Sequence, residues 1–116
     1  MPNLGLSIPV LTTPIHKFGE LARLADNAGF RSLWDYESYR NPFVLHALTA
    51  TATKRIQLGT GIAQAFIRSP FEAANAAADI DELSQGRAIL GLAYAPPLSA
   101  DATEDAYRNI VTTFGD

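Results

Sequence analysis

Residues 54–95 read KRIQLGTGIAQAFIRSPFEAANAAADIDELSQGRAILGLAYA. The segment Lys54–Ile62 has apolar residues and a Gly-Thr-Gly end, which is typical of a buried strand that lets another backbone approach closely. Ser69-Pro70-Phe71-Glu72 then predicts a helix start, because serine can cap the helix, proline suits its first turn and glutamate completes a capping box. Gly86 is expected to end this helix, and Ala88–Leu92 predicts a second strand. Together these segments form a βαβ unit, whose two strands we expect to be parallel.

The rest of the chain shows the same alternation of short apolar strands and helices. Thr13 and Asn41 each precede a proline, which predicts that each caps the start of a helix. Gly29 is expected to end the first of these helices. The expected elements are strands at 3–10 and 31–34 and helices at 14–28, at 42–53 and from Asp101 onward.

Composition narrows the class of protein and its partners. The 116 residues fit a single domain, 1–116, and 47% of them are apolar, which is enough for a hydrophobic core. The net charge of −3 gives no attraction to nucleic acid or to an anionic membrane. The absence of cysteine excludes disulfides, thiolate metal sites and a cysteine nucleophile. No basic leader and no apolar run of ~20 residues is present, so we expect a soluble cytoplasmic protein.

Four consecutive βα units predict an α/β protein with a parallel sheet. Two architectures are compatible with this order. One is a small open doubly wound parallel sheet, which the length favours if the chain is complete. The other is half of a (β/α)8 TIM barrel, whose full form needs eight units and about 250 residues.

The residues favour the half barrel, because the chain from Gly29 to Leu92 resembles the luciferase-like flavin monooxygenase family, which includes deazaflavin-dependent reductases and dehydrogenases. The resemblance rests on the order and spacing of five segments, GFRSLW (29–34), RNPFV (40–44), KRIQLGTGI (54–62), RSP (68–70) and DELSQGRAILGL (81–92). It implies FMN or a deazaflavin, coenzyme F420, laid across the carboxyl ends of the barrel strands. It also implies hydride transfer or oxygen activation directed at a small organic substrate.

The resemblance implies cofactor contacts at the ends of the third and fourth strands. Gly61 and Ile62 match the place where the family often has a non-proline cis peptide beneath the flavin ring; the alternative is an ordinary glycine that ends a strand. Thr60 either offers its hydroxyl to the flavin edge or is simply a β-branched strand residue. Gly91 completes the expected cofactor-binding set.

The resemblance places the catalytic candidates after the second strand. Glu37 matches an acidic family position, and Ser38 stands where deazaflavin-dependent members often have histidine. Serine is a poor general base without a partner, so the role of that histidine does not carry over. The alternative for Asp35 and Glu37 is that both are solvated loop charges.

Three other polar residues are weaker candidates. Arg68 either meets a phosphate or is a structural pairing residue. His16 and His46 lie far apart on expected helices without a carboxylate at ligand spacing, so they predict packing or surface roles and no metal site.

Departures from the family pattern keep a second function open. Ala93 and Ala95 stand where the family usually has glycines, so we expect a backbone without the family's positive φ there. Strands five to eight of the barrel are not in this chain, and four strands leave two open edges. We therefore expect either a homodimer of half barrels or a missing C-terminal half. The alternative function is a non-catalytic fragment without cofactor.

Overall fold

The computed structural model describes residues 3–93, so the helix expected from Asp101, and Ala95, lie outside the described residues. None of the helices in the described part is both long and apolar enough to span a membrane. The elements, in chain order, are β1 (Gly5–Leu6), η1 (Ile15–Lys17), α1 (Phe18–Asn27), β2 (Ser32–Asp35), α2 (Pro42–Ala52), β3 (Gln57–Thr60), β4 (Ala63–Gln64), η2 (Ala65–Ile67), α3 (Pro70–Leu83), β5 (Ala88–Ile89) and β6 (Leu92–Ala93).

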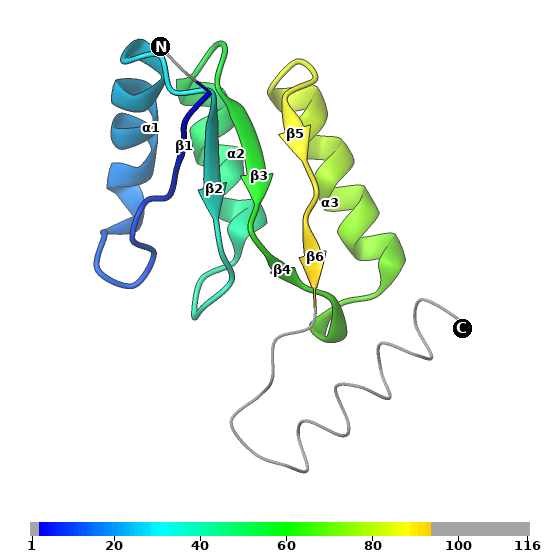
Figure 1. The fold of residues 1–116 in the computed structure, drawn as a ribbon. Coiled ribbons are helices and arrows are strands. Elements are labelled where there is room, and N and C mark those ends of the chain that lie inside the picture. Colours follow the sequence, from blue (N-terminus) through cyan, green and yellow to red (C-terminus); the bar gives the residue numbers. More distant parts are fainter. Residues whose placement is uncertain (1–2, 94–116) are drawn as a thin grey trace.

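The strands form a parallel sheet in sequential order, β1-β2-β3-β5, and a short extension pairs β4 with β6, also in parallel. A doubly wound sheet would reverse its order at a switch point, and this sheet does not. In Figure 1, α2 lies behind the strands, with α1 at the left and α3 at the right, and α2 packs between these two helices. The described chain is therefore a consecutive run of barrel-type βα units, and the doubly wound alternative is wrong.

Two of the three expected helix caps are confirmed. Asn41 Oδ1 accepts a hydrogen bond from the Phe43 amide at 2.9 Å, and Ser69 Oγ accepts one from the Glu72 amide at 3.1 Å. The cap at Thr13 is wrong, because a 3₁₀ turn precedes α1 and has no side-chain cap. The Thr13 backbone is engaged elsewhere, since its amide donates to Pro9 and its carbonyl accepts from Arg40.

The strands are shorter than the sequence predicted, for local reasons. The expected strand at 3–10 reduces to the two residues of β1, although Ile8 and Val10 beyond it are buried. The segment before β3 is held outside the ladder, because its amides donate to the Asp26 carboxylate. The last expected strand divides into β5 and β6 at Gly91, whose amide and carbonyl both bind the Thr60 hydroxyl. Glycines 29 and 86 do end their helices, with φ of 91° and 87°.

The core lies between the sheet and the helices. Leu33 on β2 and Leu58 on β3 are partners in the register, and both are buried against the helix layer together with Phe18 and Leu45. Side chains alternate along a strand, so Asp35 and Thr60, two residues further on, face the same layer. Both are buried, with exposed fractions of 0% and 3%.

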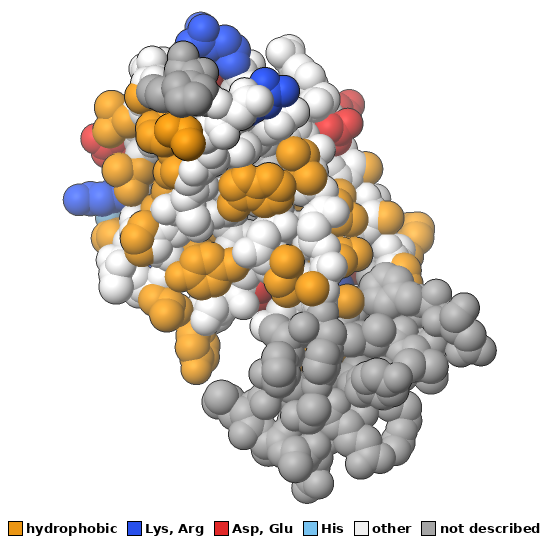
Figure 2. All heavy atoms as spheres, viewed as in Figure 1, with side chains coloured by type: hydrophobic (Ala, Val, Ile, Leu, Met, Phe, Trp, Pro, Cys, Tyr) orange, Lys and Arg blue, Asp and Glu red, His pale blue; other side chains and the backbone are white. Residues whose placement is uncertain are grey.

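The opposite face of the sheet has no helix over it among the described residues. Hydrophobic side chains are spread across this face in Figure 2. Trp34 lies here, with its ring over Gly59, and a Cβ at Gly59 would overlap that ring. The indole Nε1 donates to Ser32 Oγ at 2.9 Å. In a barrel this face lines the interior, where side chains from all strands pack together.

Candidate functional site

The carboxyl ends of β2 and β3 continue side by side beyond the regular sheet. The Gly61 amide donates to the Asp35 carbonyl at 2.8 Å, and the Glu37 amide donates to the Ile62 carbonyl at 3.0 Å. The peptide bond between Gly61 and Ile62 is cis, as the family resemblance implied. Gly61 is exposed and Ile62 is half-buried, so this strand end presents backbone and one apolar side chain at the open face.

Thr60 and Gly91 bind each other. The Thr60 hydroxyl donates to the Gly91 carbonyl at 2.7 Å and accepts from the Gly91 amide at 2.9 Å. A Cβ at Gly91 would overlap the Thr60 carbonyl oxygen, so only glycine fits this close approach. These two hydrogen bonds between Thr60 and Gly91 join β3 to the junction of β5 and β6.

Glu37 is held by a fork of hydrogen bonds. Arg68 donates from Nη1 to Glu37 Oε1 at 2.7 Å and from Nη2 to Oε2 at 2.6 Å, and the Gln64 amide also donates to Oε1 at 2.7 Å. Arg68 further contacts Glu72 and lies over the Phe43 ring. The hydrogen bond with Glu37 raises the pKa of Arg68 above its ordinary value. This bidentate pair ties η2 and its flanking loops to the end of β2.

The pairing role expected for Arg68 is confirmed, and the expectation that Asp35 and Glu37 are solvated loop charges is wrong. Asp35 is fully buried, and the Glu37 side chain is only 10% exposed. Ser38 is half-buried in the loop after β2, beside Tyr39, which is 90% exposed and has a φ of 61°. Catalytic roles for Glu37 and Ser38 stay predictions.

Sequence reasoning missed that Asp35 and His46 meet beneath the strand ends. His46 Nδ1 lies 3.5 Å from Asp35 Oδ2 and 3.1 Å from Thr49 Oγ1, while Nε2 lies 2.7 Å from the Gly59 carbonyl oxygen. Burial raises the pKa of Asp35 to about 7. Burial lowers the pKa of His46 to about 4, opposed by the hydrogen bond to Gly59. The sequence did carry a signal that Asp35 is buried: it lies two residues after Leu33, so in a strand the two side chains share a face.

The backbone expected at the family's glycine positions is confirmed where it is described. Ala93 lies in β6, pairs with Gln64 of β4 and is not among the residues with positive φ. A Cβ is tolerated there because the strand is extended. Ala95 lies outside the described residues.

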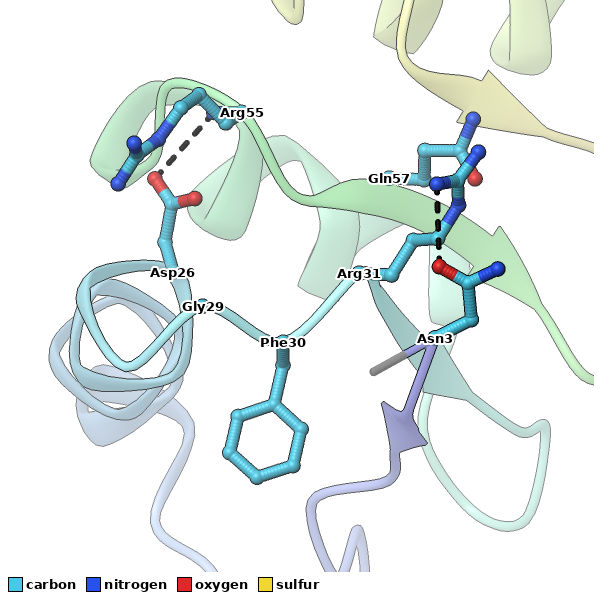
Figure 3. Close-up of a pocket in the computed structure, with 7 residues that line it drawn as sticks. All are labelled: Asn3, Asp26, Gly29, Phe30, Arg31, Arg55 and Gln57. Atoms are coloured by element: carbon cyan, nitrogen blue, oxygen red, sulfur yellow. Dashed lines mark hydrogen bonds between the residues drawn. The ribbon is translucent and has the colours of Figure 1, made fainter. Parts of the chain in front are cut away.

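A hollow of about 380 Å³ lies at the opposite end of the sheet, where the strands begin. Figure 3 shows Asp26 and Arg55 on one side of it, Arg31 and Asn3 on the other, and Phe30 between them. The amino-terminal end of barrel-type strands is the end associated with stability, so we assign no chemistry to this hollow. Within residues 3–93 no group of three or more His, Asp or Glu residues is arranged to hold a metal ion.

The strand ends fit the edge of a flat ring. Gly61 is exposed and has no side chain to obstruct a planar ligand, Ile62 offers an apolar contact, and the Trp34 ring packs 3.3 Å from where a Cβ on Gly61 would be. Arg68 does not fit a phosphate here, because its guanidinium already binds Glu37 and Glu72.

Comparison with known sequences shows the family of the chain. A sequence model described as luciferase-like monooxygenase matches residues 4–105. A 5,10-methylenetetrahydromethanopterin reductase from Methanolobus tindarius is 34% identical over 106 residues, which cover 90% of this chain and 32% of the relative. An uncharacterized protein from Mycobacterium tuberculosis is 44% identical over 79 residues, covering 63% of this chain and 23% of its own length.

Comparison with solved structures gives the same fold. The coenzyme F420-dependent tetrahydromethanopterin reductase from Methanopyrus kandleri has a TM-score of 0.71 and 29% identity, and the match covers 91% of this chain and 30% of that one. The oxygenating constituent of 3,6-diketocamphane monooxygenase from Pseudomonas putida, in complex with FMN, has a TM-score of 0.73. Its identity is 17%, and the match covers 96% of this chain and 38% of that one. The chain spans about a third of the length of these relatives.

Proposed function

The chain belongs to the luciferase-like monooxygenase family, and we propose that it supplies the first barrel units of an oxidoreductase that uses coenzyme F420 or FMN on a small organic substrate. The observation that carries this proposal is the strand end at Gly61 and Ile62. Gly61 is exposed, Ile62 adds a half-buried apolar side chain, and both lie at the carboxyl edge of parallel barrel strands, where ligands of such folds bind.

When bound, the coenzyme would supply the hydride or the oxygen chemistry. The chain would supply position. Gly61 and Ile62 would form the floor of the ring site, while Thr60 and Gly91 would set this floor by joining neighbouring strands. Ser38 would place a hydroxyl near the reactive edge of the ring.

Glu37 would act beside that edge with its carboxylate held by Arg68. Both of its oxygens are already hydrogen-bonded, which suits a residue that orients a site through a fixed charge better than one that exchanges protons freely. This arrangement favours a positioning contribution from Glu37.

Between the two coenzymes, the similarities favour F420. The relative from Methanopyrus kandleri is named as dependent on coenzyme F420 and shares 29% identity with this chain. The monooxygenase found with FMN shares 17%, which supports the fold alone. We therefore propose F420 first and FMN second.

The uncovered sheet face supports a partner built of further βα units. It carries hydrophobic side chains and lies between strand edges that have unpaired backbone groups in an isolated half barrel. We propose that a C-terminal half of the same barrel, or a second copy of the chain, covers it. Light scattering on the purified chain distinguishes monomer from dimer.

The test of function is a titration of the purified chain with F420 and, separately, with FMN, followed by coenzyme fluorescence. We expect saturable binding, tighter for F420, that is lost in Gly61→Val, because a Cβ there would lie 3.3 Å from the Trp34 ring and the larger side chain would crowd the ring site beside it. Ala78→Val on the exposed surface of α3 is the matched control and should bind normally.

The competing function is a non-catalytic domain that keeps the fold without the coenzyme. Ser38 and Ala93, which replace family residues, favour it. A chain that forms a dimer, or is joined to its C-terminal half, and still binds neither coenzyme would contradict the proposed function and support this one.

A further inference from the structure

Asp35 is a buried carboxyl group without a hydrogen-bond partner. Its exposed fraction is 0%, and neither Oδ1 nor Oδ2 accepts a hydrogen bond from any described residue. His46 Nδ1 lies 3.5 Å from Oδ2. A carboxylate in such surroundings is costly unless it is paired or neutralised, so the protonation of this pair needs an explanation.

The surroundings of His46 fix one of its two ring protons. Nε2 lies 2.7 Å from the Gly59 carbonyl oxygen, which can only accept a hydrogen bond, so Nε2 carries a proton in every state of the ring. In a neutral ring Nδ1 therefore carries no proton. The Thr49 hydroxyl also lies 3.1 Å from Nδ1, but it donates its proton to the His46 carbonyl at 3.3 Å. An ionised Asp35 would place its lone pairs against the lone pair of Nδ1, and one further proton is needed between the two residues.

That proton can lie on either residue, and the geometry favours Asp35. A charged pair would keep an imidazolium and a carboxylate buried with a contact of 3.5 Å and no other hydrogen bond to the carboxylate. Buried ion pairs offset their desolvation only with short contacts and full hydrogen bonding. A neutral acid beside a neutral imidazole avoids both charges.

No other charge among the described residues compensates for one here. The helix-facing side of β3 contributes Leu58 and Thr60, and α3 contributes Ala77 and Ile80 to the small cavity that His46 lines. The core side chains from α1 are the apolar Phe18, Ala22 and Ala25. The other buried aspartate, Asp26 of α1, lies at the opposite end of the sheet, where its carboxylate accepts from the segment before β3. Asp35 and His46 are thus the titratable pair beneath the strand ends, and burial alone moves the pKa of Asp35.

The same two residues hold the backbone on both sides of Thr60. His46 Nε2 donates to the Gly59 carbonyl, and the Asp35 carbonyl accepts from the Gly61 amide at 2.8 Å. Gly59 in turn lies directly under the ring of Trp34, the one tryptophan of the chain. We therefore expect a change in the charge of the Asp35–His46 pair to shift the backbone at Gly59–Gly61 and to alter the fluorescence of Trp34.

We propose that Asp35 keeps its proton until the pH approaches neutrality, beside a neutral His46, and that this pair positions the Gly59–Gly61 backbone. Ionisation of Asp35 sets lone pair against lone pair, pushes the imidazole from the Gly59 carbonyl and shifts the strand end. Asp35 and His46 are positioning residues. Their importance for coenzyme binding rests on the proposed function, whereas their protonation state does not.

The first test is infrared spectroscopy of the full chain and of Asp35→Asn from about pH 5 to about pH 9. We expect the stretching band of a buried protonated carboxyl group, which disappears with a midpoint near neutral pH and is absent from Asp35→Asn. Asp79→Asn, at an exposed position of α3, is the matched control and should keep the band. A spectrum with ionised carboxylates alone at the acid end of the range would overturn the proposal.

The second test is nitrogen NMR of the His46 ring at neutral pH. We expect one protonated nitrogen, Nε2, and one bare nitrogen, Nδ1. A doubly protonated ring would mean that the proton lies on His46, and the proposal would be wrong.

The third test is the pH dependence of Trp34 emission without coenzyme. In the wild type the emission maximum should move with the same midpoint as the infrared band, and in Asp35→Asn it should stay constant. An unchanged pH profile in the variant would overturn the positioning role. None of these three tests includes a coenzyme. If the proposed function is wrong, the coenzyme titration will show it, and the results of these three tests will not change.

Discussion

Two buried aspartates, one at each end of the sheet, have opposite surroundings. Asp26 lies where the strands begin, and its carboxylate accepts from the Lys54 amide at 2.7 Å and from the Ile56 amide at 3.0 Å. Asp35 lies where the strands end, and its carboxyl oxygens accept from none of the described residues. The Asp26 carboxyl group has backbone amides as donors, whereas the Asp35 carboxyl group is buried without a hydrogen-bond partner among the described residues.

Other polar groups at the two ends of the sheet also differ in whether they have hydrogen-bond partners. At the beginning of the sheet, Arg87 donates to the carbonyls of Ala50, Thr53, Ile56 and Ser84 at 2.7–3.1 Å. At the other end, Gly61 is exposed and Gln64 Oε1 is buried without a hydrogen-bond partner among the described residues. Positive φ does not separate the two ends, because Tyr39 has it at the second end and Gln85 at the first. Barrel folds place stability at the first end and function at the second. Unsatisfied groups and unusual backbone are expected to gather at functional sites.

The sharpest test of this comparison is to remove each carboxylate. Asp26→Ala leaves three backbone amides of the segment before β3 without this acceptor, and we expect a loss of about 4 kcal/mol of unfolding free energy. Asp35→Asn replaces the acid by a neutral isostere that cannot ionise, so at pH 7 it escapes the loss that the raised pKa of Asp35 brings to the wild type, and we expect no loss of stability. Urea unfolding at pH 7 measures both. Equal losses would remove the distinction between the two ends.

The second prediction concerns stability against pH. The raised pKa of Asp35 gives stability that is full below 3.8 and lost as the pH rises through about 7. The lowered pKa of His46 gives stability that is full above 6.5 and lost as the pH falls toward about 4. In the wild type these two dependences oppose each other between pH 4 and 6.5.

In Asp35→Asn only the histidine dependence is left. A pKa of about 4 against 6.5 corresponds to about 3 kcal/mol, so the variant should gain that stability between pH 4 and 6.5. His46→Gln should show the reverse slope, with stability falling toward pH 7. Urea unfolding at each pH measures this, and parallel curves for wild type and both variants would contradict it.

The third prediction compares two glycines near the functional end. Gly91→Ala would drive a Cβ into the Thr60 carbonyl oxygen, which is backbone and cannot move freely, so we expect a loss of about 3 kcal/mol. Gly59→Ala would meet the Trp34 ring, which borders the open face and can turn, so we expect about 1 kcal/mol. Thermal unfolding orders the two variants. A larger loss for Gly59→Ala would mean that Trp34 is locked in place.

The fourth prediction concerns the pair that holds η2. Arg68→Lys keeps the charge and loses the fork to Glu37, for which we expect a loss of about 1 kcal/mol. Arg23→Lys, at an exposed position of α1, is the matched control and should change stability by less than about 0.3 kcal/mol. Coenzyme titration of the same variants tests whether the fork also supports binding. A loss as small as that of the control would show that Glu37 does not depend on the fork.

The elements predicted well from the sequence are those fixed by neighbouring residues. The caps at Asn41 and Ser69 and the stops at Gly29 and Gly86 depend on groups within a few positions, and all four were confirmed. The βαβ unit followed from these signals together with the apolar runs. Its parallel pairing was confirmed by the register of β3 with β5.

The site was less predictable because its contacts join distant positions. Glu37 and Arg68 are 31 residues apart, and no local pattern shows that they meet. Asp35 was expected just outside its strand, and one more residue of strand turns it inward beneath His46. His46 itself lies on a helix with apolar residues on several sides, so helical spacing did not distinguish its partner. The family resemblance, and no physical argument from the residues, supplied the expectation at Gly61 and Ile62.

The smallest expected change in stability is that of Tyr39→Gly, which relieves an unfavourable backbone conformation and removes an exposed ring. A tyrosine with a φ of 61° is disfavoured by about 1 kcal/mol, and glycine relieves this but gains freedom in the unfolded chain. Tyr39→Gly should therefore stabilise the chain by no more than about 0.5 kcal/mol in urea unfolding. Since the ring is 90% exposed, its removal costs little packing.

If the functional end keeps unfavourable groups for binding, Tyr39→Gly should also weaken coenzyme or substrate affinity. A gain in stability with unchanged affinity would instead make Tyr39 an ordinary loop residue and confine the functional end to the strand termini beneath it.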